Sequence, residues 1–205
     1  GDGRVGALQK YSGKKVILVT NCAPGTGPSH ADSGPTGPKY HYTEAPTSIA
    51  NRLATTLAAT VAAHHLTIVY SRPFAQESST LEKGHPTYYD GNVDVRVGST
   101  LGDIGVQVNH PTTTQQPFTG KCDGTGFADC RRTTLADGGV LQTDQLKVGH
   151  GTYIIEAQLS RPDGTLVQVQ ESNYGFGPEA GKSYGDQPLP LSTLVAITQD
   201  SAYSF

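Results

Sequence analysis

The segment TYIIEAQLSRPDGTLVQVQES, residues 152–172, predicts an antiparallel β-hairpin and, with it, the class of the fold. Val167 and Val169 in its second half alternate with glutamines. Residues 161–164, Arg-Pro-Asp-Gly, favour a tight turn, because proline presets φ at a turn and glycine tolerates a positive φ. Apolar side chains also occupy alternate positions of the first half and face one way, namely Tyr153, Ile155, Ala157 and Leu159.

The same alternation continues toward the N-terminus. Short strands are predicted at residues 131–135 and 140–146, around an Ala-Asp-Gly-Gly turn. A second hairpin is predicted from residues 93–97 and 104–108, where valine and isoleucine alternate with polar residues or glycine. This pattern is typical of strands with one face on the core, so we expect their other face to lie in water.

Residues 47–64 predict the main helix. An apolar residue recurs at every fourth position, with alanines beside it, and this stripe suits packing on a sheet. Thr47 or Ser48 is expected to cap the N-terminus of the helix. The stripe consists of Ile49, Leu53, Leu57 and Val61.

After this helix we expect a strand at residues 66–70 and then a loop over 71–91, which is polar and holds two prolines. A short C-terminal helix is predicted at about 192–199, with Ser192 as its cap. The elements together predict an α+β fold, in which both helices lie on one face of an antiparallel sheet of about five to seven strands.

Residues 1–45 predict a loop-rich arm with one strand at 15–20, and residues 46–205 an α+β body, within a single domain. Glycine and proline are too frequent after this strand for a regular element. Because a loop longer than about 12–15 residues is usually functional or mobile, we expect a binding surface there. Its candidate side chains are His30, Asp32, Tyr40, His41, Tyr42 and Glu44.

These candidates also have simpler interpretations. Tyr40 and Tyr42 suit a binding surface, but they equally suit alternate positions of a short edge strand. His30 and His41, with the nearby carboxylates, are a conceivable metal site, but solvated loop histidines explain them as well. We therefore predict no metal site and no cofactor.

The composition favours a globular chain and argues against nucleic acid as a partner. Charged residues make up 16% of the 205 residues and the net charge is −3, whereas nucleic-acid-binding domains are usually basic. No apolar run approaches the roughly 18 residues of a membrane span. The chain starts at Gly1 and contains no methionine, so we expect a processed or truncated product.

The chain contains three cysteines. Cys122 and Cys130 bracket a short segment with two glycines, which lets the chain turn back, so we expect a disulfide bond between them. Two unrelated reduced thiols are the alternative. A metal pair fits less well, because zinc ligands usually have about two to four residues between them. Cys22 is left over and is either free or paired elsewhere.

No catalytic motif is present. The sequence has no Gly-x-Ser-x-Gly elbow, no His-Glu-x-x-His and no Ser-x-x-Lys. His64 and His65 are adjacent at the expected end of the main helix, where side chains project about 100° apart and rarely bind one ion. Imidazoles favoured by the helix dipole are the simpler interpretation. We predict no catalytic residue.

Several turns and core positions resemble a family of actinobacterial cell-envelope proteins, which are often tethered by an N-terminal helix or a lipid. The resemblance rests on the Cys122–Cys130 pair with the following Thr-Leu-Ala-Asp-Gly at 134–138, on the Arg-Pro-Asp-Gly turn at 161–164 and on the paired prolines of 187–191. Ala136 stands where the family usually has proline. The family has no established catalytic residues that carry over.

This resemblance and the expected disulfide bond imply an extracytoplasmic location, because disulfides persist in oxidising compartments. We expect a non-catalytic domain that binds, senses or interacts with a protein or another ligand of the bacterial cell envelope. One alternative is a secreted hydrolase whose dispersed Ser, His and Asp residues meet only in the fold. The other is a structural or assembly protein that uses its strand edges.

We predict that Cys122 and Cys130 are joined in the purified chain. The loop that they close is short, so the bond should stabilise the fold by the lower end of about 2–4 kcal/mol. Intact-mass measurement with and without reductant, followed by peptide mapping, checks the pairing. Free thiols at both positions would remove this argument for an oxidising compartment.

Overall fold

The computed structural model describes residues 10–11, 14–15, 43–76, 86–97, 100–110, 127–149, 152–173 and 188–205. The chain divides into two units, Gly1–Pro38 and Lys39–Phe205. The first unit contains the antiparallel pair β1 (Lys10–Tyr11) and β2 (Lys14–Lys15). Residues 16–20 of the strand expected in the arm lie outside the described residues.

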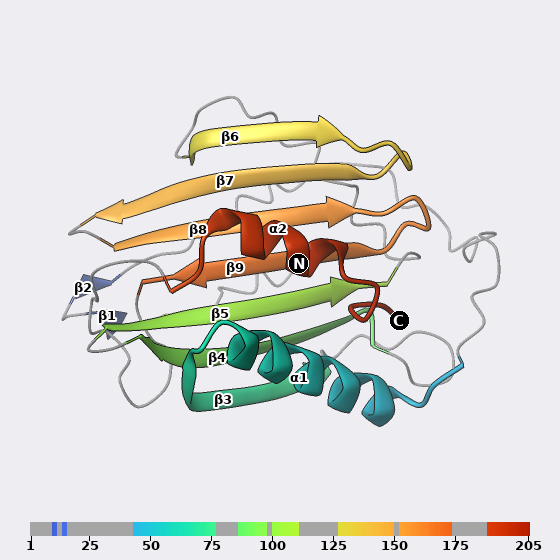
Figure 1. Ribbon diagram of the computed structural model, residues 1–205, viewed down its shortest axis with the longest axis horizontal. Coiled ribbons are helices and arrows are strands. Elements are labelled where there is room, and N and C mark those ends of the chain that lie inside the picture. The colour runs from blue at the N-terminus through green and yellow to red at the C-terminus, as the bar shows by residue number, and fades with distance from the viewer. Residues whose placement is uncertain are drawn as a thin grey trace, which may run out of the picture. The chain divides into compact units, whose positions relative to one another are not determined.

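The second unit is built on one seven-stranded sheet in the order β3-β4-β5-β9-β8-β7-β6 (Figure 1). Every neighbouring pair is antiparallel. With its two helices, this sheet confirms the predicted α+β class. The strands are β3 (Thr67–Gln76), β4 (Tyr88–Val97), β5 (Thr100–Asn109), β6 (Phe127–Thr134), β7 (Val140–Gly149), β8 (Thr152–Ser160) and β9 (Leu166–Ser172).

Two turns of the same design join β6 to β7 and β8 to β9. In each turn an aspartate side chain accepts the backbone N–H two residues ahead: Asp137 from Gly139 at 2.8 Å, and Asp163 from Thr165 at 2.8 Å. The glycines that follow the aspartates have φ of 90° and 87°, a conformation that favours glycine. Both predicted Asp-Gly turns are therefore confirmed.

The helices α1 (Pro46–Ala63) and α2 (Leu191–Gln199) begin one residue earlier than expected. The predicted side-chain caps are wrong, because Ala45 and Pro190 occupy the N-cap positions and neither makes a side-chain cap hydrogen bond. Pro46 is at the start of α1, where its fixed φ suits the helix and its missing N–H costs nothing.

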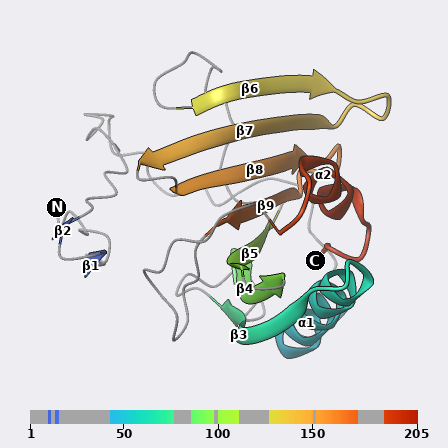
Figure 2. The same cartoon turned by 60° about the vertical axis from the view of Figure 1, so that its left-hand side comes forward.

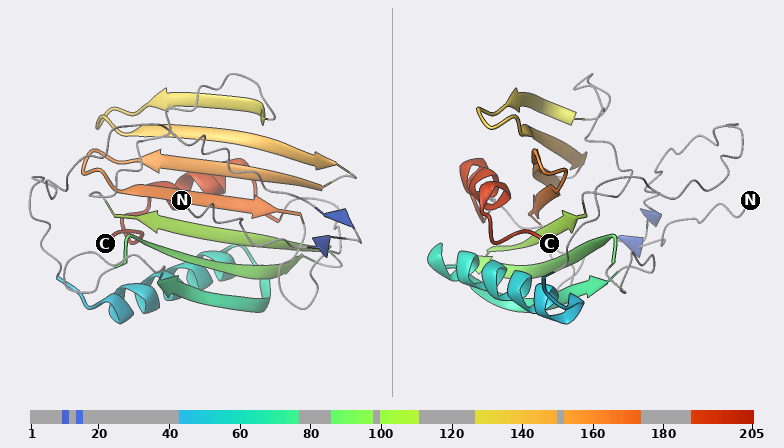
Figure 3. Two further views of the ribbon diagram at one scale, coloured as in Figure 1. Left: turned by 180° about the vertical axis from the view of Figure 1, so that it is seen from behind. Right: turned by 90° about the vertical axis from the view of Figure 1, so that its right-hand side faces the viewer.

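Both helices lie on the same face of the sheet, as Figures 2 and 3 show. α1 packs on β3 and β4, and α2 packs on β8 and β9. The predicted apolar stripe of α1 is buried with at most 1% of each side chain exposed. The valines and isoleucines of β4, β5, β8 and β9 that face the helices complete one core.

The edge of the sheet beside α1 differs from the expectation. The loop predicted over residues 71–91 is wrong at both ends, because β3 continues to Gln76 and β4 already begins at Tyr88. The strand passes through Pro73 with register shifts on either side of Arg72. An edge strand tolerates proline, because only one of its sides must donate to the ladder.

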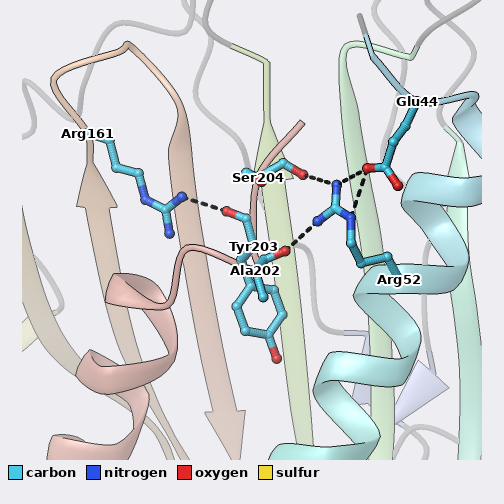
Figure 4. A network of polar contacts seen from close by, with 6 residues as sticks. All are labelled: Glu44, Arg52, Arg161, Ala202, Tyr203 and Ser204. Carbon is cyan, nitrogen blue, oxygen red and sulfur yellow. Dashed lines mark hydrogen bonds and ion pairs between the residues drawn. The ribbon is translucent and has the colours of Figure 1, made fainter.

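Two arginines hold the C-terminal segment between the helices (Figure 4). Arg52 of α1 donates to the carbonyls of Ala202 and Ser204, and it forms an ion pair with Glu44 at 2.6 Å. Arg161, which follows β8, donates to the carbonyl of Tyr203 at 2.7 Å and to two carbonyls at the end of α2. The segment therefore links the two helices through charge-assisted hydrogen bonds.

We predict that Leu57→Ala lowers the free energy of unfolding by about 2–5 kcal/mol, because the side chain is 1% exposed in the core between α1 and the sheet. Thr55→Ala, on the exposed side of the same helix, is the matched control and should change stability by less than about 0.5 kcal/mol. Denaturant unfolding of both variants measures the difference. Equal stabilities would contradict the core assignment.

Candidate functional site

The face of the sheet opposite the helices is lined by polar side chains in register. On an antiparallel sheet, residues directly opposite one another project from the same face. The cross-strand pairs therefore place polar residues of six neighbouring strands in one continuous row. From β6 to β4 this row consists of Arg132, Gln142, Gln158, Gln168, Gln107 and Asp90.

A second row lies beside the first. Its one gap is Gly105, where an added Cβ would meet only Asn92 Cβ at 3.8 Å and the Gln170 carbonyl at 4.0 Å. From β7 to β3 the row consists of Asp144, Glu156, Gln170, Gly105, Asn92 and Arg72. We call these two rows, with the adjacent pair Asp94 and Asp103, the amide–carboxylate face.

The prediction that this face lies in water is wrong for much of it. Asp94 is 1% exposed, Gln158 is 2% exposed and Asp103 is 4% exposed. Asn92, Gln142 and Asp144 are at most 7% exposed. Both helices lie on the other side of the sheet, so the helices do not explain this burial (Figure 3). The sheet thus has an apolar face and, on its other side, a polar face that is buried at its centre and exposed at its two ends.

Hydrogen bonds on the amide–carboxylate face run from amides to carboxylates. Asn92 Nδ2 donates to Asp103 Oδ2 at 2.6 Å, and Gln142 Nε2 donates to Asp144 Oδ2 at 3.4 Å. Gln158 Nε2 donates to Glu156 in the same way. The carbonyl oxygens of these three amides are buried and have no hydrogen-bond partner among the described residues: Asn92 Oδ1, Gln142 Oε1 and Gln158 Oε1.

Burial shifts the titration of the carboxyl groups. Desolvation raises the pKa of Asp103 to about 8, although the hydrogen bond from Asn92 opposes the shift. Desolvation also raises the pKa of Glu156 to about 7, with repulsion from Asp144 acting in the same direction. The pKa of Asp144 is raised by the same cause. Asp103 and Glu156 therefore titrate near neutral pH, so these two groups are able to hold or release a proton there.

This chemistry suits binding by hydrogen bonds. A carboxylate and an amide carbonyl accept, while an amide NH₂ donates, and a hydroxyl group complements both kinds of atom. The groups are planar and are fixed by a regular sheet, which holds them in a preset arrangement. The same carboxyl groups, if protonated near neutral pH, could donate a proton to a bound molecule.

The structure reaches few of the site residues predicted from the sequence. Most of the predicted site residues and two of the cysteines lie outside the described residues, so their roles stay predictions. These residues are His30, Asp32, Tyr40, His41, Tyr42, Cys22 and Cys122. Glu44 is described, and it accepts two hydrogen bonds from Arg52. Cys130 is disulfide-bonded, and its pairing with Cys122 stays a prediction. His64 and His65 are exposed after α1.

The amide–carboxylate face itself was missed, although the sequence carries a signal for it. Three consecutive strands each contain two amide or carboxyl residues separated by one residue: Gln142-x-Asp144, Glu156-x-Gln158 and Gln168-x-Gln170. Such spacing places both side chains on one face of a strand. In an antiparallel meander the three pairs become neighbours, which makes a block of six polar side chains.

No protein-family model, no curated protein and no solved structure matches the chain. Among the described residues no group of three or more His, Cys, Asp or Glu side chains is placed to hold a metal ion. Within the same part of the chain, no helix is both long and apolar enough to cross a membrane.

We predict that the stability of the free protein falls as the pH rises from about 4 to about 8. The folded state binds the proton of Asp103 more tightly than the unfolded state does, so stability is highest below the unfolded pKa and is lost as the pH rises through the folded pKa. Burial raises the pKa of Glu156 to about 7 and that of Glu171 to about 8, so both groups act in the same direction.

Asp103→Asn keeps the acceptor for Asn92 but removes the titration, so it should flatten the pH dependence by up to about 1.4 kcal/mol per pH unit. Urea unfolding at a series of pH values measures the slope. Thr55→Ala, on the exposed side of α1, removes no titratable group, so it is the control and should leave the slope unchanged. A stability that rises with pH over this range would contradict the burial of these carboxyl groups.

Proposed function

We propose that this chain is a non-catalytic binding domain of the bacterial cell envelope, and that the amide–carboxylate face holds a hydroxyl-rich ligand such as a saccharide. The observation that carries the proposal is the set of three buried amide carbonyl oxygens, on Asn92, Gln142 and Gln158, that have no hydrogen-bond partner in the described part of the chain. An unsatisfied buried polar atom costs about 1–3 kcal/mol, and ligand hydroxyls would supply the missing donors.

The pattern of neighbouring groups also favours a saccharide. Vicinal hydroxyls donate and accept at short, fixed spacings, and neighbouring strands present amides and carboxyls about 5 Å apart. Each of the two rows offers both donors and acceptors along its length. A purely apolar ligand would leave these groups without partners, which makes it a poor candidate for this face.

The proposed location rests on two other observations. Cys130 is disulfide-bonded, and disulfide bonds persist mainly in oxidising compartments. The turn and cysteine motifs resemble those of actinobacterial envelope proteins. We propose an extracytoplasmic domain, secreted or anchored at the outer face of the cytoplasmic membrane.

A hydrolase that uses the paired carboxyl groups is the second candidate. Asp144 and Glu156 stand directly opposite each other on β7 and β8, and the pKa of Glu156 is raised to about 7. A carboxyl group that is still protonated near neutral pH suits a general acid, and an ionised neighbour suits a base or nucleophile. Incubation with the bound saccharide, followed by mass spectrometry, separates the two candidates, because a binding domain returns the saccharide intact.

We predict that the full chain binds at least one member of a panel of mono- to tetrasaccharides that includes both neutral sugars and amino sugars, measured by saturation-transfer NMR and calorimetry. Gln158→Leu replaces an amide of the face by an apolar side chain of similar size. It should weaken binding about tenfold or more, because the ligand loses a buried hydrogen-bond partner. Stability should change little, since the change removes an unsatisfied oxygen together with the hydrogen bond to Glu156, and the two effects oppose each other.

Thr55→Ala, on the exposed side of α1, serves as the control and should bind as the unaltered chain does. The proposal fails if no saccharide of the panel binds. It fails equally if Gln158→Leu binds as tightly as the control.

A further inference from the structure

Four side chains of the amide–carboxylate face form a block that differs from the rest of the face. Gln142 and Asp144 lie on β7, and Glu156 and Gln158 lie on β8. The register pairs Gln142 with Gln158 and Asp144 with Glu156, so the four side chains occupy the corners of one square on the sheet. We call them the quartet.

The quartet atoms that make no hydrogen bond within the described residues are acceptors. One N–H of each amide NH₂ group, on Gln142 and Gln158, already donates to Asp144 or Glu156. The two amide carbonyl oxygens are buried and have no partner in the described part of the chain, and these two residues are 5% and 2% exposed. The two carboxyl groups are acceptors as well when ionised. A group that fills the quartet must therefore bring donors.

The quartet also lacks a positive charge. Asp144 and Glu156 repel each other, which contributes to the raised pKa of Glu156. On β9 the facing residues are the neutral Gln168 and Gln170. On the other side, β6 has a register shift between Ala128 and Arg131, opposite Thr143 and Gln145, so no β6 residue is in register with Asp144.

The basic side chains nearest to the quartet in the described sheet either form an ion pair elsewhere or lie opposite a glutamine of the quartet rather than one of its acids. Arg132 of β6 is opposite Gln142 and is exposed. Arg72, at the far end of the row that contains the acids, forms an ion pair with Asp90 at 2.7 Å. No described basic side chain is in register with Asp144 or Glu156 on either neighbouring strand.

These observations favour a group with several donors and a positive charge. A protonated primary amine has three N–H donors and one positive charge, whereas a hydroxyl brings one donor and no charge. A metal ion fits less well, because only two carboxylates meet in the quartet and hard cations take about six to eight oxygen ligands. The described residues contain no larger cluster of metal-binding side chains.

We infer that the quartet binds the ammonium group of an amino sugar, so that the ligand of the amide–carboxylate face is a saccharide with a free amine rather than a neutral one. This inference rests on the proposed function and names its ligand class. The ammonium lies between Asp144 and Glu156 and donates to their carboxylates and to the two glutamine carbonyls. Its positive charge attracts both carboxylates, and this attraction offsets the repulsion between them.

The test compares the β-1,4-linked glucosamine trimer with its fully N-acetylated counterpart, which has the same backbone without the charge. Calorimetry with the full chain at pH 6.5 should show the amine form binding at least about tenfold more tightly. In buffers with different ionisation enthalpies, binding of the amine should release protons, because the cation favours the ionised carboxyl groups. Added salt should weaken the amine form selectively.

Glu156→Gln keeps the size of the side chain and its hydrogen-bonding atoms but removes the charge. It should lower the affinity ratio of the two trimers several-fold and reduce proton release, because Asp144 alone remains to attract the ammonium, while the acetylated trimer binds as before. Asp137→Asn removes a carboxylate from an exposed turn outside this face and is the matched control, which should keep the full preference.

Equal affinities for the two trimers, a preference for the acetylated trimer, or binding of neither would overturn the inference. In each of these cases, binding of some neutral saccharide that depends on Gln158 would leave the proposed function standing. Calcium that binds in the micromolar range and is lost in Glu156→Gln would also overturn it, in favour of a metal site.

Discussion

The register between β5 and β9 is the constraint on which the rest of the second unit depends. This pairing is the only one that joins strands β3 to β5 to strands β6 to β9 within the described sheet. It sets Val106 opposite Val169 and Gln107 opposite Gln168. A slip of one residue would exchange the two faces of one half relative to the other, placing valines among amides. Both the core and the polar rows therefore exist only in the observed register.

Packing against the apolar face of the sheet determines where the helices and the C-terminal segment lie. Leu194 and Ile197 of α2 are 0% and 3% exposed and share one core with the apolar stripe of α1. Glu171 is buried on this face as well, and its carboxylate accepts the N–H of Leu189 just before α2. Phe205 packs against Tyr89 and His110, with ring centroids 5.1 Å and 4.8 Å away. Packing and polar contacts thus fix the segment between the helices.

Local sequence patterns were sufficient to predict most of the fold. The alternation along β8 and β9, the two Asp-Gly turns and the four-residue spacing on α1 each depend on neighbours in the chain, and all three are found. The predictions that failed depend on context. A proline is a loop signal unless its strand lies at an edge, as Pro73 does in β3.

The polar face could not be predicted in the same way, because burial is a tertiary property. The residues alternating with valine along a strand are usually solvated, and the sequence gives no measure of what lies above them. The pairing of Asp144 with Glu156 joins residues of two strands, and the extension to Asn92 needs the β5–β9 register. The abundance of glycine and proline predicts a binding surface in the N-terminal arm, and this stays a prediction because most of that arm lies outside the described residues.

The composition of this face is difficult to explain by stability alone. A leucine or valine at the positions of Gln142 and Gln158 would bury apolar surface and leave no unpaired carbonyl. Two acids directly opposite each other destabilise a sheet, and no cation in register with them within the described strands relieves the repulsion. Costs of this kind are retained at sites that complete their interactions only when a ligand binds. The polar atoms that lack partners among the described residues therefore identify the chemistry of the molecule that is expected to fill the face.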